Sequence, residues 1–112
     1  MATVIRNTDY MGDRYKYDFH FCYFKNGWAQ LDTRQDASYY GNWINPLTRE
    51  LFSYCEGDVT HIQCDDDADF AAEVLACVNW HKEAGYFIGI DGMCQPQIIE
   101  AFTSLGFADL LH

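Results

Sequence analysis

The chain has 112 residues and a mass of 13.0 kDa, and its 7 Lys and Arg against 17 Asp and Glu give a formal net charge of −10. This charge argues against a protein that binds nucleic acid or an anionic membrane directly, because both depend on Lys and Arg that neutralise phosphates. Hydrophobic residues make up 49% of the chain and aromatic residues 17%, which argues against disorder. The length predicts a single domain over residues 1–112, since two cores of half this size would each be marginal.

Most of the first 64 residues are predicted to form β-strands. Residues 15–24 alternate between two faces, and Asn26-Gly27 follows them. Asn-Gly between alternating segments predicts a two-residue hairpin turn. Asn45 to Thr48 predicts a second tight turn, because Pro46 already has the φ that its position requires. The predicted strands cover residues 15–24, the segment that pairs with it from Trp28 to Leu31, and residues 39–44, 50–55 and 59–64.

Two helices are predicted in the rest of the chain. Asp66 or Asp67 is expected to cap the first helix, whose apolar residues recur at helical spacing from Phe70 to His81, and Gly85 is expected to end it. Pro96 is expected at the first position of the second helix, which Gly106 ends. Residues 86–90 are predicted as an extended connection or one more strand. The predicted fold class is α+β: an antiparallel sheet of about five strands followed by two C-terminal helices packed on one face.

The charge is distributed unevenly along the chain. Residues 1–49 carry six basic and five acidic residues, whereas residues 50–112 carry twelve acidic residues and one basic residue, Lys82. Such asymmetry bears on partners and association kinetics. We predict a partner-binding patch here, and its alternative is a solvated acidic face that keeps the protein soluble. The acidic members of the predicted patch are Glu56, Asp58, Asp65, Asp66, Asp67, Asp69 and Glu73.

Aromatic residues are predicted on both faces of the sheet, and one layer of helices covers only one face. Some rings are therefore expected to be exposed, and Tyr and Trp are the residues that anchor protein interfaces. Tyr39, Tyr40 and Trp43 are predicted as partner-binding residues for this reason. The alternatives are a sheet that curls enough to bury the rings and a homodimer formed through that face.

The cysteines predict a reduced environment. Their number is five, no C-x-x-C pair occurs, and the first residues show no signal peptide, so a cytoplasmic location is expected. Cys55, His61 and Cys64 have the spacing C-x5-H-x2-C, and Cys77 and His81 lie four residues apart, but tight zinc knuckles are missing. We therefore expect structural thiols, no metal and no cofactor, with a zinc site kept as an alternative.

The Asp65–Asp69 segment places four carboxylates within five residues. It does not match a calcium-binding EF-hand loop, because Phe70 stands where that loop needs Gly and Ala76 where it needs Glu. A looser Mg²⁺ or Ca²⁺ site remains an alternative. The other explanation is helix capping, since carboxylates at a helix start favour its macrodipole.

No motif predicts a catalytic site. The chain lacks the G-x-S-x-G, H-E-x-x-H, P-loop and G-x-G-x-x-G patterns. His20 and Cys22 share one strand face, but no third group is evident that would orient them for nucleophilic chemistry. No catalytic residue is therefore predicted.

From these features we expect a small acidic, non-enzymatic binding or inhibitor protein whose partner is a basic, nucleic-acid-handling protein. The class analogies are DNA mimics of phages and mobile elements, including anti-CRISPR and antirestriction proteins, and immunity proteins against nucleases. The alternatives are a small enzyme that uses His and Asp or a metal, and a homo-oligomeric structural protein.

Overall fold

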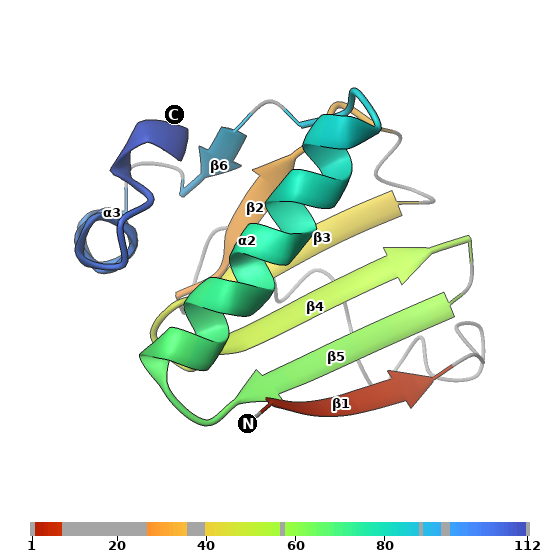
Figure 1. Cartoon of the computed structure of the whole chain (residues 1–112), viewed down its shortest axis with the longest axis horizontal. Helices are drawn as coiled ribbons and strands as arrows, with labels where there is room; N and C mark the ends of the chain where they lie inside the picture. The colour runs from red at the N-terminus through yellow and green to blue at the C-terminus, as the bar shows by residue number, and fades with distance from the viewer. Residues whose placement is uncertain are drawn as a thin grey trace.

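The computed structural model describes residues 2–7, 27–35, 40–56, 58–87, 89–92 and 95–111, with the backbone alone for residues 2–7, 58 and 59. In this part of the chain, six strands form one antiparallel sheet in the order β1-β5-β4-β3-β2-β6 (Figure 1). The strands are β1 (Ala2–Asn7), β2 (Ala29–Asp32), β3 (Tyr40–Asn45), β4 (Glu50–Cys55), β5 (Asp58–Cys64) and β6 (Gly89–Asp91). The helices are α2 (Asp67–Glu83), α3 (Pro96–Ser104) and the short 3-10 helix η2 (Ala108–Leu110).

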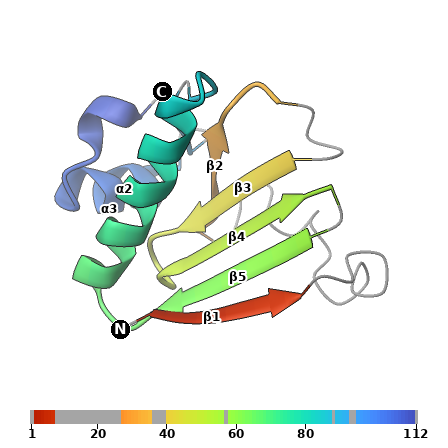
Figure 2. The same ribbon diagram turned by 45° about the vertical axis from the view of Figure 1, so that its right-hand side comes forward.

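The predicted α+β class is confirmed: an antiparallel sheet is followed by two helices on one of its faces. Figures 1 and 2 show α2 crossing the sheet and α3 beyond the β2–β6 edge, on the same side. The helices share one core with the sheet, in which Phe70, Val74 and Phe102 are fully buried against strand residues such as Leu31 and Ile44. Burial of this apolar surface holds the helical layer on the sheet.

Local signals account for the boundaries of these elements. The Asn45 side chain accepts hydrogen bonds from the backbone N–H groups of Leu47 (3.0 Å) and Thr48 (3.1 Å), which closes the predicted turn between β3 and β4. Asp66 caps α2 by accepting from the Asp69 N–H at 2.8 Å, so the first of the two proposed caps is the correct one. Gly85 follows α2 with φ +83°, the left-handed conformation that glycine adopts most readily.

The second helix also begins and ends as predicted. Pro96 is its first residue, and Gly106 follows it with φ +91°. The chain then forms η2, and Leu111 makes a parallel bridge to Ile90 in β6. The C-terminal end is thereby docked on the sheet.

The strand predictions differ from the structure in two places. The structure places β1 at an edge of the sheet, paired with β5, where no strand was predicted. Residues 89–91 form a strand, β6, which was the second of the two alternatives for that segment. The predicted strand at residues 15–24 and its hairpin turn at Asn26 lie outside the described residues.

The sheet face opposite the helices is also buried. Trp43 is 0% exposed, and Phe52 and Tyr54 are exposed by 4% and 5%. A Cβ atom on Gly41 would lie 2.4 Å from the Tyr54 ring, so this ring packs directly over the glycine backbone. The expectation that Trp43 is an exposed ring is therefore wrong, because both faces of the sheet are covered at this point.

Within the described part of the chain, none of the helices is long and apolar enough to cross a membrane.

Candidate functional site

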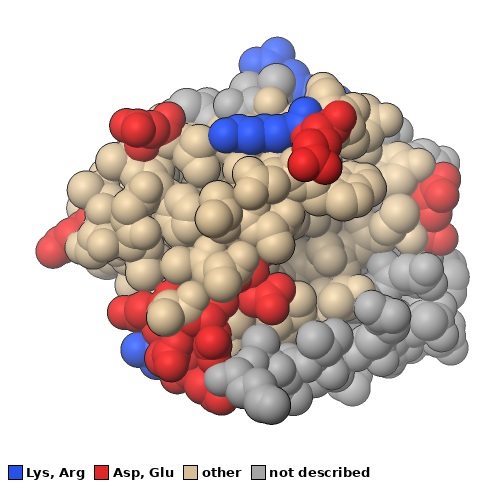
Figure 3. Space-filling model, in the orientation of Figure 1, with Lys and Arg blue, Asp and Glu red and all other residues tan. Residues whose placement is uncertain are grey.

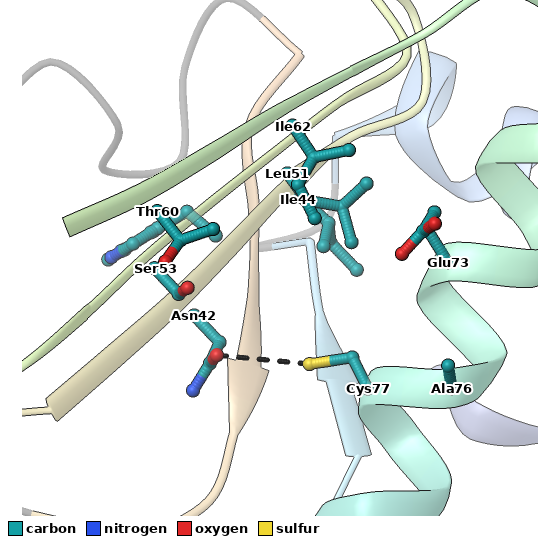
Figure 4. A pocket seen from close by; sticks show the side chains of 10 residues that line it. Asn42, Ile44, Leu51, Ser53, Thr60, Ile62, Glu73, Ala76 and Cys77 are labelled. Carbon is teal, nitrogen blue, oxygen red and sulfur yellow. Dashed lines mark hydrogen bonds between the residues drawn. The ribbon is translucent and has the colours of Figure 1, made fainter. Parts of the chain in front are cut away.

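A hollow of about 270 Å³ lies between α2 and strands β3, β4 and β5. It opens on the face seen in Figure 3, beside the helix, and Figure 4 shows the side chains that line it. The hollow exists because the buried stripe of α2, from Phe70 through Val74 to Val78, turns toward the shared core. The helix flank with Glu73 and Cys77 then faces these three strands at a greater distance.

The strand register builds the floor of the hollow from two rows. Ile44 pairs with Leu51, and Leu51 with Ile62, which forms an apolar row across the three strands. Two positions along, Asn42, Ser53 and Thr60 are paired in the same way and form a polar row. Residues two apart on a strand share one face, so both rows face α2.

The helix closes the other side with Glu73, Ala76 and Cys77. Figure 4 shows Glu73 opposite the apolar row and Cys77 opposite the polar row. Within the described residues, no hydrogen bond or ion pair engages the Glu73 carboxylate or the hydroxyls of Ser53 and Thr60. The hollow therefore combines an apolar wall with three polar groups that have no partner there, which is the composition typical of ligand pockets.

A hydrogen-bond network fixes the polar end of the hollow. His81 Nδ1 lies 2.8 Å from the Cys77 carbonyl oxygen, which can only accept, so Nδ1 carries the proton. In the neutral ring, Nε2 is then an acceptor, and the Asn42 side-chain amide donates to it across 3.3 Å. The Asn42 oxygen in turn faces the Cys77 thiol at 3.8 Å. Each side chain of this Asn42–Cys77–His81 network is thus satisfied in its neutral form.

This network resembles a cysteine nucleophile with its base, but its electrostatics oppose that chemistry. Burial, with a smaller contribution from Glu73, raises the pKa of the Cys77 thiol from 9.0 to about 11. Nucleophilic cysteines need the opposite shift, because the thiolate is the reactive form. His81 Nδ1 lies 3.7 Å from the sulfur, but its proton is directed at the carbonyl oxygen. The arrangement holds α2 on β3 and leaves the thiol protonated at neutral pH.

The predicted acidic patch divides into two groups. Asp65, Asp66 and Asp67 are exposed at the start of α2, with Asp69 and Glu73 half-buried behind them. Glu56 and Asp58 lie at the opposite end of β5 from Cys64, and six strand residues span about 20 Å. Figure 3 shows the acidic side chains gathered most densely in one corner of the visible face. The seven predicted residues therefore fall into two groups at opposite ends of β5.

Part of the first acidic group has a structural role. Asp66 is the helix cap, and Asp67 pairs with Arg49 at 2.9 Å in an exposed ion pair. The Asp67 carboxylate raises the pKa of the Arg49 guanidinium through a hydrogen bond. Capping and pairing thus account for Asp66 and Asp67.

The second acidic group lies beside one of the predicted aromatic residues. The Tyr40 hydroxyl donates to Glu56 at 2.9 Å, and this hydrogen bond raises the pKa of Tyr40. Tyr39 lies outside the described residues. The large exposed rings that the structure does describe are Trp80 (61% exposed) and Tyr86 (44%), near the C-terminal end of α2. Trp80 lies seven residues from Glu73 and so on the same helix flank. Trp80 does not fall on the apolar stripe of the helix, and this position in the sequence could have predicted that its ring is exposed.

The candidate zinc ligands do not converge. Cys55 is exposed at one end of the β4–β5 hairpin, and Cys64 is buried at the other end of β5. His61 lies on the sheet face that points away from α2. There its ring contacts Phe52 and its Nε2 lies 2.6 Å from Glu50. Among the described residues, no three His, Cys, Asp or Glu side chains are placed to hold a metal ion.

Comparisons of the chain with protein-family models, with curated proteins and with solved structures give no match.

Proposed function

We propose that this protein is a small acidic, non-enzymatic binding protein of the cytosol that presents carboxylates to a basic, nucleic-acid-handling protein. The proposal includes inhibitors of the DNA-mimic type and immunity proteins against nucleases. The observation that supports it is the exposed row Asp65–Asp67 at the start of α2, within a C-terminal part where Lys82 is the one basic residue. Carboxylates in a row can occupy phosphate-binding positions of a basic partner.

The proposed contact surface is the first group of the acidic patch with the adjoining flank of α2. Asp65, Asp67 and Asp69 supply charge there, and Arg49 pairs with Asp67. Trp80, at the far end of the flank, supplies an exposed ring of the kind that anchors interfaces. Glu56 and Asp58 lie at the other end of β5, outside this flank of α2. They contribute to the long-range attraction that steers a basic partner toward the protein.

The test is capture of partners from a lysate of the host cell, at low and then at moderate salt, with the bound proteins identified. The native protein is compared with a triple variant, Asp65→Lys, Asp67→Lys and Asp69→Lys. Asp66 is left unchanged because it caps the helix. The matched control replaces Glu83, Glu100 and Asp109, which are exposed elsewhere, by Lys. Each triple variant changes the net charge from −10 to −4, because every replacement adds two charges.

We expect the native protein and the control variant to retain a basic nucleic-acid-handling protein that the first variant loses. Moderate salt should weaken this capture, since exposed charges are screened over about 8 Å at physiological ionic strength. If both variants capture the same proteins as the native chain, the proposed surface is wrong. Sedimentation of the same samples measures self-association. The proposal expects a monomer that captures its partner, whereas a homo-oligomeric structural role expects an oligomer.

A further inference from the structure

The hollow beside α2 adjoins the proposed contact surface and shares Glu73 with it, but Asp65, Asp67 and Asp69, which carry the proposed function, do not line it. Its apolar wall is formed by Ile44, Leu51 and Ile62, and its two polar ends lie on opposite sides of that wall. Glu73 forms one end, and the hydroxyls of Ser53 and Thr60 form the other. A site of this shape and chemistry selects for a particular kind of small molecule.

Glu73 determines the charge of that molecule. Its side chain is half-buried, points toward the apolar row and has no hydrogen bond or ion pair within the described residues (Figure 4). A carboxylate that is partly removed from water and unpaired is stabilised by a cation that reaches it. Arg49, a cationic side chain near this end of α2, is bound to Asp67. The position opposite Glu73 is therefore suited to a ligand cation.

The remaining walls determine its length and its other end. A cavity of about 150 Å³ holds a benzene molecule, so 270 Å³ accommodates a chain of roughly ten non-hydrogen atoms. The middle of such a chain would lie along the apolar row. Its far end would meet Ser53 and Thr60, whose hydroxyls both donate and accept hydrogen bonds. The Asn42–Cys77–His81 network fixes the side chains beside this polar end.

We propose that this hollow binds a short aliphatic amine with a hydroxyl group at its far end. The ammonium group pairs with Glu73, the hydrocarbon chain covers Ile44 and Leu51, and the hydroxyl bonds to Ser53 or Thr60. Binding here and capture of a protein partner are separate properties, and each is measured without the other.

The test uses 6-aminohexan-1-ol as the probe, titrated into the isotopically labelled full chain at millimolar concentration and followed by NMR shifts. The matched neutral probe is 1,6-hexanediol, which has the same length but no cation. We expect the amine to bind about tenfold more tightly than the diol, because a hydrogen bond to a charged group contributes more than a neutral one. The largest shifts should occur at residues 73–77, 53 and 60.

Three variants make the result specific. Glu73→Gln should remove the preference for the amine while leaving binding of the diol unchanged. Glu83→Gln, at an exposed site near the end of the same helix, should keep the tenfold preference. Thr60→Val should weaken the amino alcohol severalfold through its hydroxyl end, which gives an independent reading if Glu73→Gln does not fold.

Equal affinity of the native chain for the amine and the diol would overturn the proposal. A preference that survives in Glu73→Gln, or shifts confined to residues 65–69, would overturn it equally, since either result would mean general attraction of cations to an acidic surface. The result of the amine titration does not depend on whether the Asp65, Asp67 and Asp69 variant loses partner capture.

Discussion

Asn42 and His81 are 39 positions apart in the chain, yet the Asn42 side-chain amide donates to His81 Nε2 across 3.3 Å and joins β3 to α2. His81 is 6% exposed, so its ring is largely removed from water. The same histidine anchors its other nitrogen on the Cys77 carbonyl of its own helix. The helix is therefore tied to the sheet by a polar contact as well as by its apolar stripe.

Replacing Asn42 by Ala is expected to lower the free energy of unfolding by about 1–3 kcal/mol, because a buried ring nitrogen loses its donor. Urea unfolding followed by circular dichroism measures this change. The double variant Asn42→Ala, His81→Ala should lose about 1 kcal/mol less stability than the sum of the losses in the two single variants, as expected for residues in contact. Additive effects would mean that the contact contributes nothing to stability.

The thiol of Cys77 should make stability depend on pH in alkaline solution. Its pKa is 9.0 in an ordinary environment and about 11 in the folded chain, so the folded state binds this proton more tightly than the unfolded state. The resulting stability is present in full below about pH 9 and is lost as the pH rises toward 11, by about 2 kcal/mol in total. The measurement is the slope of unfolding free energy against pH over this window.

Cys77→Ala should show a shallower slope than the native chain, and Cys55→Ala, at an exposed thiol, serves as the control. Alkylation at pH 8, read site by site by mass spectrometry, gives a second measurement. Cys55 should react much faster than Cys64 and Cys77, because burial raises the pKa of both of these thiols to about 11. Fast alkylation of Cys77 in the folded protein would contradict the assignment of a protonated thiol.

The capping role of Asp66 predicts a stability loss that depends on hydrogen bonding rather than on charge. Asp66→Ala should lower the free energy of unfolding by about 1 kcal/mol, because the Asp69 N–H loses its acceptor. Asp66→Asn removes the same charge but retains a capping oxygen, so it should stay close to the native stability. Thermal unfolding of the two variants distinguishes the cases. Equal losses in both would assign the effect to the charge at the helix start instead.

Interactions between near neighbours in the chain were accessible from the sequence. Asn45 closes a turn through Leu47 and Thr48, and Asp66 caps a helix through Asp69, all within three residues. Such contacts depend on residue type and spacing alone, so the strands on either side of the turn and the start of α2 were predicted correctly. The helix period likewise identified the stripe that packs against the sheet. The strand β1 was missed because its pairing with β5 joins residues about 60 positions apart.

The candidate site depended on contacts that no local pattern encodes. The polar row of Asn42, Ser53 and Thr60 arises from the register of three strands, and the position of Glu73 over the apolar row arises from how α2 lies on them. Likewise, Trp43 is buried whereas Trp80 is exposed, although both rings were available to the same composition argument.

The sequence by itself determined the net charge of −10, its concentration after residue 49 and the α+β fold class. The tertiary structure decided which carboxylates share a surface. Asp65 to Asp69 gather at one end of β5, and Glu56 and Asp58 lie at its other end. The physical reason is that charge is additive along the chain, whereas proximity is set by strand direction and length, which become fixed only when the sheet is assembled.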